Sequence, residues 1–314
     1  MKYNSLGATG VSVSAIAFGC GPKAGLMVKG SAEERRRAVA RALELGITLF
    51  DTASIYGDGL SETHLGETLK ELKATPIIGS KVALETPDLK DIKGTVIRSV
   101  EDSLKRLQVE SIELIQLHNR VGSQRADRSD MGVGAQLTVD DVLGDGGVLD
   151  AFETLRQQGK VNWFGFTALG GQLPCVYELI DSGKFHSING GYNVLNPSAM
   201  NARTEPQVDR DFGEVFTRSA AKDMGVIVIR VLAAGILAGS EPNAGAERVK
   251  SLLAAQGISP VEGAVRFVLS SPKVSTAVIG FSELAHIEEA VAASNNGVLP
   301  ADLVQELEAV TLTS

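Results

Sequence analysis

Residues 49–59 read LFDTASIYGDG, an apolar run that ends in an aspartate and is followed by a turn of small residues. A strand that ends at Asp51 places this carboxylate at the carboxyl edge of a sheet, where ligand sites gather in α/β folds. Gly57 and Gly59 permit a tight turn, which would bring Tyr56 back beside Asp51. Taken alone, the stretch fits an ordinary strand-to-helix loop with a solvated aspartate equally well.

The composition is that of a large, acidic globular chain. With 314 residues, 44% of them hydrophobic, the chain can bury an extensive core, and α/β barrels of this length form single domains. We therefore expect one domain over residues 1–314. The formal net charge of −8 argues against a nucleic-acid partner or a polybasic membrane surface. The sequence shows no secretory leader or long apolar run, and two cysteines imply no disulfide framework, so we expect a cytoplasmic protein.

Segments typical of strands alternate with segments typical of helices along the chain. The predicted strands are residues 14–19, 47–51, 76–82, 111–118, 160–167, 187–191, 225–229 and 275–279. The predicted helices are residues 31–45, a helix that begins at 61, 94–107, 148–158, a stretch that ends at 182, 211–223, 245–255, 260–270, 283–293 and 300–310. This alternation implies a parallel sheet, and eight such units favour a closed (β/α)8 TIM barrel. A hairpin within residues 2–14 is expected to plug one end of the barrel.

An open, doubly wound sheet is the alternative architecture. Folds of that kind that bind dinucleotides carry Gly-x-Gly-x-x-Gly after the first strand. Residues 19–24 read GCGPKA and lack the third glycine, which weakens this alternative.

Other polar residues converge on the opening stretch. Lys81 and His118 lie at or near the carboxyl ends of the next two predicted strands, and in a barrel all these ends face one mouth. A single lysine or histidine at such a position is usually a solvated or packed group. Together with Asp51 and Tyr56, however, the two residues form a coherent chemical device.

That device suits hydride transfer to a carbonyl, a reaction that needs a proton donor for the oxygen. The ordinary pKa of tyrosine is about 10, and a nearby lysine charge is expected to lower the pKa of Tyr56. Asp51 would hold Lys81 charged and oriented. His118 would donate a hydrogen bond to the carbonyl oxygen and orient the substrate.

These motifs resemble the aldo-keto reductase family. Residues 50–57 together with residues 61–66 are similar to the first signature of that family, and Lys81 and His118 fall where the remaining members of its catalytic tetrad are expected. The resemblance implies a (β/α)8 barrel that binds a nicotinamide cofactor without a Rossmann fold. It also implies a small-molecule aldehyde, ketone or sugar as substrate, with the corresponding alcohol as product.

The same resemblance implies contacts to the cofactor. They comprise Asp51, Thr167, Asn189, Arg230, Leu232, Gly235, Gly239, Gly280, Ser282 and Glu289. Thr167 and Asn189 would bind the nicotinamide carboxamide. The glycine-rich residues 232–239 would cross the pyrophosphate, with small side chains and backbone N–H groups available to it. Ser282 would contact the 2′-phosphate at a helix N-terminus.

Several positions next to these contacts depart from the family pattern. Ala168 and Ala290 stand where asparagines are usual, Ile229 replaces a stacking aromatic residue, and His286 replaces an arginine that grips the 2′-phosphate. Because a hydrogen bond to a charged group contributes about 1.5–3 kcal/mol, the last change weakens the case for NADP(H). We expect NADP(H), in keeping with the family, with NAD(H) as the alternative.

Two other functions are open at this stage. A non-catalytic barrel could bind cofactor and regulate a partner, as some relatives do, although the intact tetrad argues against that role. A metal-dependent lyase would need ligands, but the four histidines show no metal-binding spacing, so no metal is predicted.

Substrate identity and oligomeric state are not readable from the sequence. The long polar insertion at residues 119–145 is the candidate for specificity, since loops of this length are usually lids or disordered. Its Arg120, Arg125 and Arg128 could meet a polar or acidic substrate, or belong to a solvated loop of mixed charge. The few residues after the last predicted helix predict an open mouth.

Overall fold

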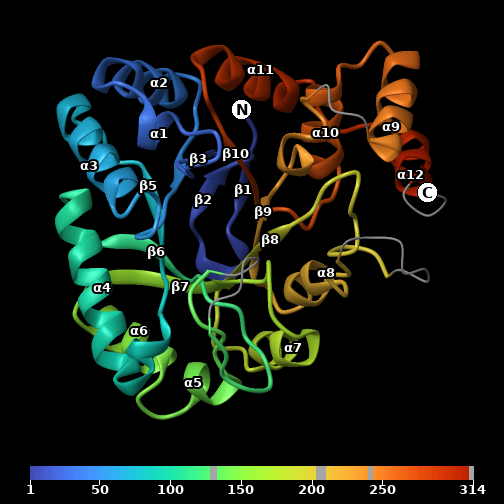
Figure 1. The fold of residues 1–314 in the computed structure, drawn as a ribbon. Coiled ribbons are helices and arrows are strands. Elements are labelled where there is room, and N and C mark those ends of the chain that lie inside the picture. Colours follow the sequence, from blue (N-terminus) through green and yellow to red (C-terminus); the bar gives the residue numbers. More distant parts are fainter. Residues whose placement is uncertain (128–132, 203–209, 240–242, 311–314) are drawn as a thin grey trace.

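The computed structural model describes residues 1–127, 133–202, 210–239 and 243–310 (Figure 1). Its parallel strands close into a barrel in the order β10-β3-β4-β5-β6-β7-β8-β9. These strands are β3 (Ile16–Gly19), β4 (Leu49–Asp51), β5 (Ile77–Val82), β6 (Ile112–Leu117), β7 (Val161–Thr167), β8 (Ser187–Gly191), β9 (Gly225–Ile229) and β10 (Thr276–Gly280). Each predicted strand is present, which confirms the (β/α)8 barrel and excludes the open sheet.

The helices surround the strands (Figure 1). They are α1 (Leu26–Lys29), α2 (Ala32–Glu44), α3 (Leu60–Leu72), α4 (Ile92–Leu107), α5 (Val139–Leu143), α6 (Val148–Gln157), α7 (Leu173–Asp181), α8 (Val215–Ala220), α9 (Ala244–Ala255), α10 (Pro260–Leu269), α11 (Leu284–Asn295) and α12 (Ala301–Val310). Ser31 and Glu34 form a capping box at the start of α2. The prediction of a helix over residues 211–223 was too long, because Gly213, Glu214 and Asp223 adopt left-handed backbone angles that flank the shorter α8.

The predicted hairpin closes the barrel at the end where the strands begin. β1 (Tyr3–Ser5) and β2 (Ser12–Ser14) pair antiparallel, as expected. Between them, the amide of Ala8 donates to the carbonyl of Asp223, just before β9, at 2.8 Å. Leu6 is fully buried in a small apolar cluster inside the barrel. The hairpin therefore acts as the plug that the sequence predicts.

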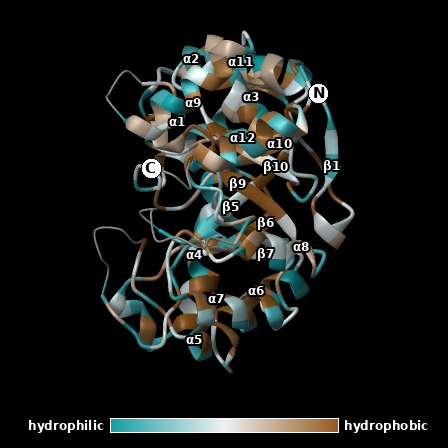
Figure 2. Ribbon diagram, turned by 90° about the vertical axis from the view of Figure 1, so that its right-hand side faces the viewer, coloured by the Kyte–Doolittle hydropathy of each residue, from teal (hydrophilic) through white to brown (hydrophobic). Residues whose placement is uncertain are grey.

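Two apolar layers hold the barrel together. The larger lies between the strands and the helices, and the smaller fills the barrel interior. Figure 2 shows hydrophobic colour concentrated on the central strands, whereas the surrounding helices carry mixed colours. Among the described residues, no single helix is long and apolar enough to span a membrane; α9 and α10 reach that length only together, across a 91° bend.

The insertion at residues 119–145 has more structure than its composition indicates. It contains α5, and isolated bridges pair Val121 with Leu137 and Ala126 with Gln136. Arg128 and the C-terminal residues 311–314, on which the prediction of an open mouth depends, lie outside the described residues.

Candidate active site

Strand alternation turns the predicted catalytic side chains into the barrel. In β4, Leu49 belongs to the interior cluster and Phe50 to the layer beneath the helices. Because successive side chains of a strand point to opposite faces, Asp51 points inward like Leu49. In β5, Ser80 points outward to α3, so its neighbour Lys81 points inward beside Asp51.

Asp51 and Lys81 form a buried ion pair. The Lys81 ammonium donates to Asp51 Oδ1 at 2.5 Å and to the carbonyl of Thr52 at 2.7 Å. Asp51 is 4% exposed and Lys81 is 2% exposed. Burial lowers the pKa of Lys81, but the Asp51 charge and hydrogen bond outweigh burial, so the pKa is raised and the ammonium keeps its charge.

Tyr56 and His118 lie next to this pair. Lys81 Nζ is 5.2 Å from the centroid of the Tyr56 ring, and the ring centroids of Tyr56 and His118 are 5.9 Å apart at 74°. The amide of His118, directly after β6, donates to the carbonyl of Val82 at 2.8 Å and holds the two strand ends together. The structure thus brings all four predicted catalytic residues into one cluster.

The protonation of this cluster differs in part from the expectation. Burial raises the pKa of Tyr56 by more than the Lys81 charge lowers it, so its pKa lies above the ordinary value rather than below it. Burial and the Lys81 charge lower the pKa of His118 to about 3. At neutral pH the cluster therefore holds a protonated phenol, a neutral imidazole and a charged ammonium.

A buried carboxylate ties the Tyr56 loop to the outer face of the barrel. Glu62 of α3 is fully buried and accepts hydrogen bonds from Ser80 Oγ at 2.5 Å and from Arg106 Nε of α4 at 2.7 Å. Arg106 also packs on Gly59, where an added Cβ would lie 2.7 Å from Arg106 Cδ and where φ is +88°. Only glycine satisfies both conditions without strain, so Glu62 and Gly59 together position the loop.

Buried polar atoms without partners line the interior next to the cluster. The amide nitrogen and the amide oxygen of the Asn189 side chain are both buried without a hydrogen-bond partner in the described chain. The same holds for Gln116 Oε1 and His118 Nδ1. Thr167 Oγ1 donates to the carbonyl of His118 at 3.1 Å and keeps its capacity to accept a hydrogen bond. A carboxamide group beside Asn189 would accept a hydrogen bond from its amide nitrogen and donate one to its amide oxygen. These residues therefore fit the carboxamide of a nicotinamide cofactor.

Gln116 was missed by the sequence reading. Its Nε2 lies 3.5 Å from Asp51 Oδ2, on the side of the carboxylate away from Lys81. The signal was available, because Gln116 is two positions from the inward-facing Leu114 in an otherwise apolar strand.

The segment predicted to cross the pyrophosphate, residues 232–239, forms hydrogen bonds within itself. The amides of Gly235 and Gly239 donate at 2.9 Å to the carbonyls of Leu232 and Gly235, so these N–H groups are already engaged. Two of the backbone N–H groups in residues 232–239, the segment predicted to cross the pyrophosphate, are thus occupied within the loop itself. The exposed side chain of Arg230 is the charged group that this segment presents.

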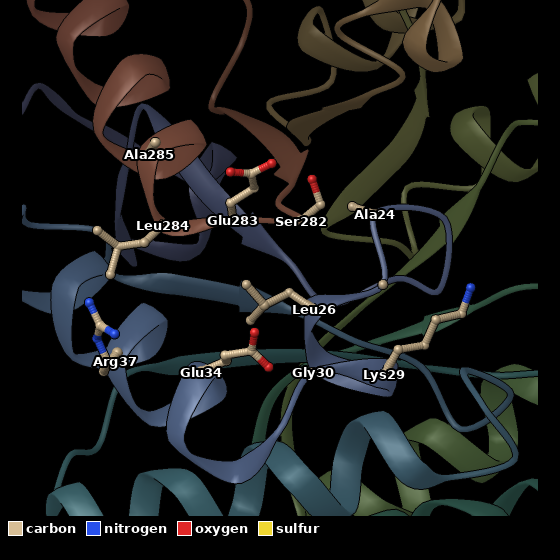
Figure 3. A pocket seen from close by; sticks show the side chains of 11 residues that line it. Ala24, Leu26, Lys29, Gly30, Glu34, Arg37, Ser282, Glu283, Leu284 and Ala285 are labelled. Atoms are coloured by element: carbon tan, nitrogen blue, oxygen red, sulfur yellow. The ribbon is translucent and has the colours of Figure 1, made fainter.

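A hollow of about 620 Å³ lies between α1, α2 and the start of α11, and none of the four predicted catalytic side chains lines it. Figure 3 shows Glu34 and Arg37 on one side of it and Ser282 to Ala285, at the start of α11, on the other. Lys29 also lines it. Gly280 packs closely here, since an added Cβ would lie 3.0 Å from that of Ala24.

Ser282, which the resemblance assigns to the adenosine end of the cofactor, lines this hollow. Ser282 Oγ and His286 Nδ1 are 3.1 Å apart, and Glu289 is exposed further along α11. Lys29 and Arg37 were missed, because only the pairing of β10 with β3 brings their helices next to α11. Lys29 and Arg37 bring positive charge to the hollow, and Glu34 and Glu283 bring negative charge.

The comparison with known proteins agrees with this geometry. The model of the Aldo/keto reductase family matches residues 16–311. The chain belongs to the aldo/keto reductase family. Members of this family are oxidoreductases that act on small molecules and generally use NAD(P)H. Among the described residues, no three histidine, cysteine or acidic side chains gather as a metal site.

Individual relatives of this aldo/keto reductase are distant. L-galactose dehydrogenase of Arabidopsis thaliana is 25% identical over 309 residues, covering 93% of this chain and 88% of the relative. A Schizosaccharomyces pombe protein named as a candidate voltage-gated potassium channel subunit beta is 26% identical, with coverage of 93% and 88%. The holo form of an aldo-keto reductase from Bacillus halodurans superposes with a TM-score of 0.78 at 24% identity, covering 99% of this chain and 96% of that one, which shows the shared fold.

Proposed function

We propose that this protein is an NADP(H)-dependent aldo-keto reductase that interconverts aldehydes or ketones, sugars included, with their alcohols. The observation that carries the proposal is the buried Asp51–Lys81 pair with Tyr56 and His118 beside it at one end of the barrel. Residues 1–314 would act as one catalytic domain in the cytoplasm.

Each side chain has a defined part in the proton transfer. A bound nicotinamide cofactor would supply the hydride in reduction and accept it in oxidation. In reduction, neutral His118 donates a hydrogen bond to the carbonyl oxygen, and the phenol of Tyr56 delivers the proton to that oxygen. Lys81 stabilises the resulting tyrosinate, and Asp51 keeps the ammonium charged and in place. In oxidation the same tyrosinate accepts the proton of the alcohol.

The cofactor is proposed on the chemistry of the residues present. Asn189 and Thr167 would bind the carboxamide, since both are buried and Asn189 lacks partners. Ser282 together with Lys29 and Arg37 would favour NADP(H) over NAD(H), because a phosphate prefers cationic and hydroxyl neighbours. Asp51, Leu232, Gly235, Gly239, Gly280 and Glu289 complete the proposed cofactor set. Arg230, which the resemblance also assigns to the cofactor, is proposed to bind the substrate instead.

Tyr56→Phe tests the catalytic proposal. Removal of one hydroxyl is expected to lower the rate of NADPH oxidation with an aldehyde panel by about 10²–10⁴-fold, the usual contribution of a positioned acid. The Kd for NADPH, measured by fluorescence titration, is expected to stay unchanged. Tyr3→Phe is the matched control, since that exposed hydroxyl donates to the carbonyl of Gly46 at the opposite end of the barrel. Undiminished turnover in Tyr56→Phe would refute the assignment.

The similarity to the Schizosaccharomyces pombe protein favours one alternative, a cofactor-binding barrel that regulates a partner. The two functions separate in a single-turnover experiment. An enzyme oxidises bound NADPH when a carbonyl compound is added, whereas a regulatory barrel retains the reduced cofactor with every carbonyl compound tested.

A further inference from the structure

Three arginines gather where neighbouring strands of the barrel end. Arg120 lies two residues after His118 at the end of β6, and Arg230 comes directly after β9. Arg210 lies in the connection between β8 and α8. The strands β6, β7, β8 and β9 are successive neighbours in the barrel, so these connections share one side of its mouth.

The glycines after β7 join two of these arginines. A Cβ added to Gly170 would lie 3.1 Å from Cβ of Arg120. Arg210 Nη2 donates to the carbonyl of Gly171 at 2.8 Å, and its guanidinium lies 5.8 Å from the centroid of the Phe212 ring. Arg120 and Arg210 are thus held on adjacent residues of one short segment.

Arg230 follows β9, the neighbour of β8 in the barrel. The preceding Ile229 pairs in register with Gly191 at the end of β8. Arg230 itself has φ +58°, in the left-handed region, which is uncommon for a residue with a Cβ and marks a strained position. Such strain persists where the surrounding structure or a function maintains it.

The three charges are close enough to repel one another. Arg210 is half-buried, and its pKa is lowered by burial and by the charges of Arg230 and Arg120. Neither Arg210 nor Arg230 forms an ion pair with another described residue. Arg125, in the same insertion as Arg120, differs, because its Nε lies 3.0 Å from both carboxylate oxygens of Asp141.

We propose that Arg120, Arg210 and Arg230 form an anion site at the mouth of the barrel, and that the carbonyl substrate carries a carboxylate or phosphate group. Guanidinium groups bind both anions through paired hydrogen bonds. Because Arg120 is two residues from His118, an anion held there leaves the carbonyl carbon of the same small molecule near Tyr56. The substrate class rests on the proposed function; the anion site itself does not.

Steady-state kinetics with matched substrates test the substrate class. A short aldehyde acid is compared with its methyl ester, and a triose phosphate with the free triose. The wild type is expected to show a KM about ten- to a hundredfold lower for the anionic member of at least one pair, as for one charge-assisted hydrogen bond. That advantage should shrink in high salt. Equal KM values within both pairs would overturn the proposal.

Two variants locate the effect. Arg210→Met should raise the KM of the preferred anionic substrate about ten- to a hundredfold, with the neutral partner unchanged. Arg230→Gly removes a charge and relieves the left-handed backbone strain. The variant should therefore be at least as stable as the wild type and still bind the anionic substrate more weakly. Arg218→Met is the control, since Arg218 pairs with Asp181 on the surface. A loss of NADPH affinity in Arg210→Met with no change in substrate KM would assign the arginines to the cofactor and refute the proposal.

Equilibrium binding separates this site from the proposed reaction. A dicarboxylate that cannot be reduced is titrated calorimetrically into the wild type, Tyr56→Phe and Arg210→Met. Binding in the first two and not in the third supports the anion site even where no turnover is found. Absence of binding in all three would overturn the anion site, and leaves the test of Tyr56 intact.

Discussion

Replacement of Lys81 by methionine is expected to destabilise the fold more than any surface ion-pair change. Lys81 makes two hydrogen bonds, of 2.5 Å to Asp51 and 2.7 Å to Thr52, and methionine retains most of its volume but neither bond. The variant leaves the Asp51 carboxylate 4% exposed, with Gln116 Nε2 at 3.5 Å as its remaining side-chain partner among the described residues. Removal of one partner from a buried pair typically costs about 3–5 kcal/mol.

The loss is measured as the difference in the free energy of unfolding between Lys81→Met and the wild type, obtained by urea titration at neutral pH.

Two further variants make the argument refutable. Lys81→Met combined with Asp51→Asn removes both charges and should recover most of the lost stability, since no bare charge remains buried. Lys160→Met breaks a pair with Glu101, in which the side chains are 31% and 37% exposed, and should cost at most about 1 kcal/mol. The reasoning fails if Lys81→Met costs as little as Lys160→Met, or if the double variant is no more stable than Lys81→Met.

Three further predictions concern protonation, cofactor choice and metals. Because the pKa of His118 is lowered to about 3, the unfolded chain binds one more proton than the folded chain between about pH 6.5 and pH 3. The free energy of unfolding should therefore decrease as the pH is lowered through this window, and it should decrease less steeply in His118→Asn. Identical slopes for the two proteins would contradict the shift. His286→Arg adds a cation beside Ser282 and should tighten NADPH relative to NADH about ten- to a hundredfold in fluorescence titrations; equal gains for both would place the 2′-phosphate elsewhere. Activity should survive dialysis against EDTA, and a loss restored by a divalent metal would show a missed ligand set.

Much of the architecture could be read from local patterns. The alternation of strand and helix predicted the barrel, and Asp51, Lys81 and His118 were placed at successive strand ends without knowledge of the fold. These predictions succeeded for two reasons. Successive side chains of a strand point to opposite faces of the sheet, and the carboxyl ends of parallel strands all face one mouth of the barrel. The helix over residues 211–223 failed where left-handed backbone angles, invisible to periodicity, confine α8 to six residues.

Cofactor contacts were harder to predict because they depend on how residues far apart in sequence meet. Closure of the barrel places β10 next to β3, which brings Lys29 and Arg37 to the start of α11. The amides of Gly235 and Gly239 turned out to be engaged by their own loop. No local pattern in either segment indicates these relations.

The sequence by itself determined which groups are available, namely a tyrosine, a lysine, an aspartate and a histidine at the strand ends of a (β/α)8 barrel. Only the tertiary structure decided their protonation, because burial outweighs the Lys81 charge at Tyr56 and keeps His118 neutral. It also decided that Arg120 and Arg210 both lie against the glycines that follow β7. Both results have the same cause: desolvation and charge act over a few ångströms in space, whatever the separation along the chain.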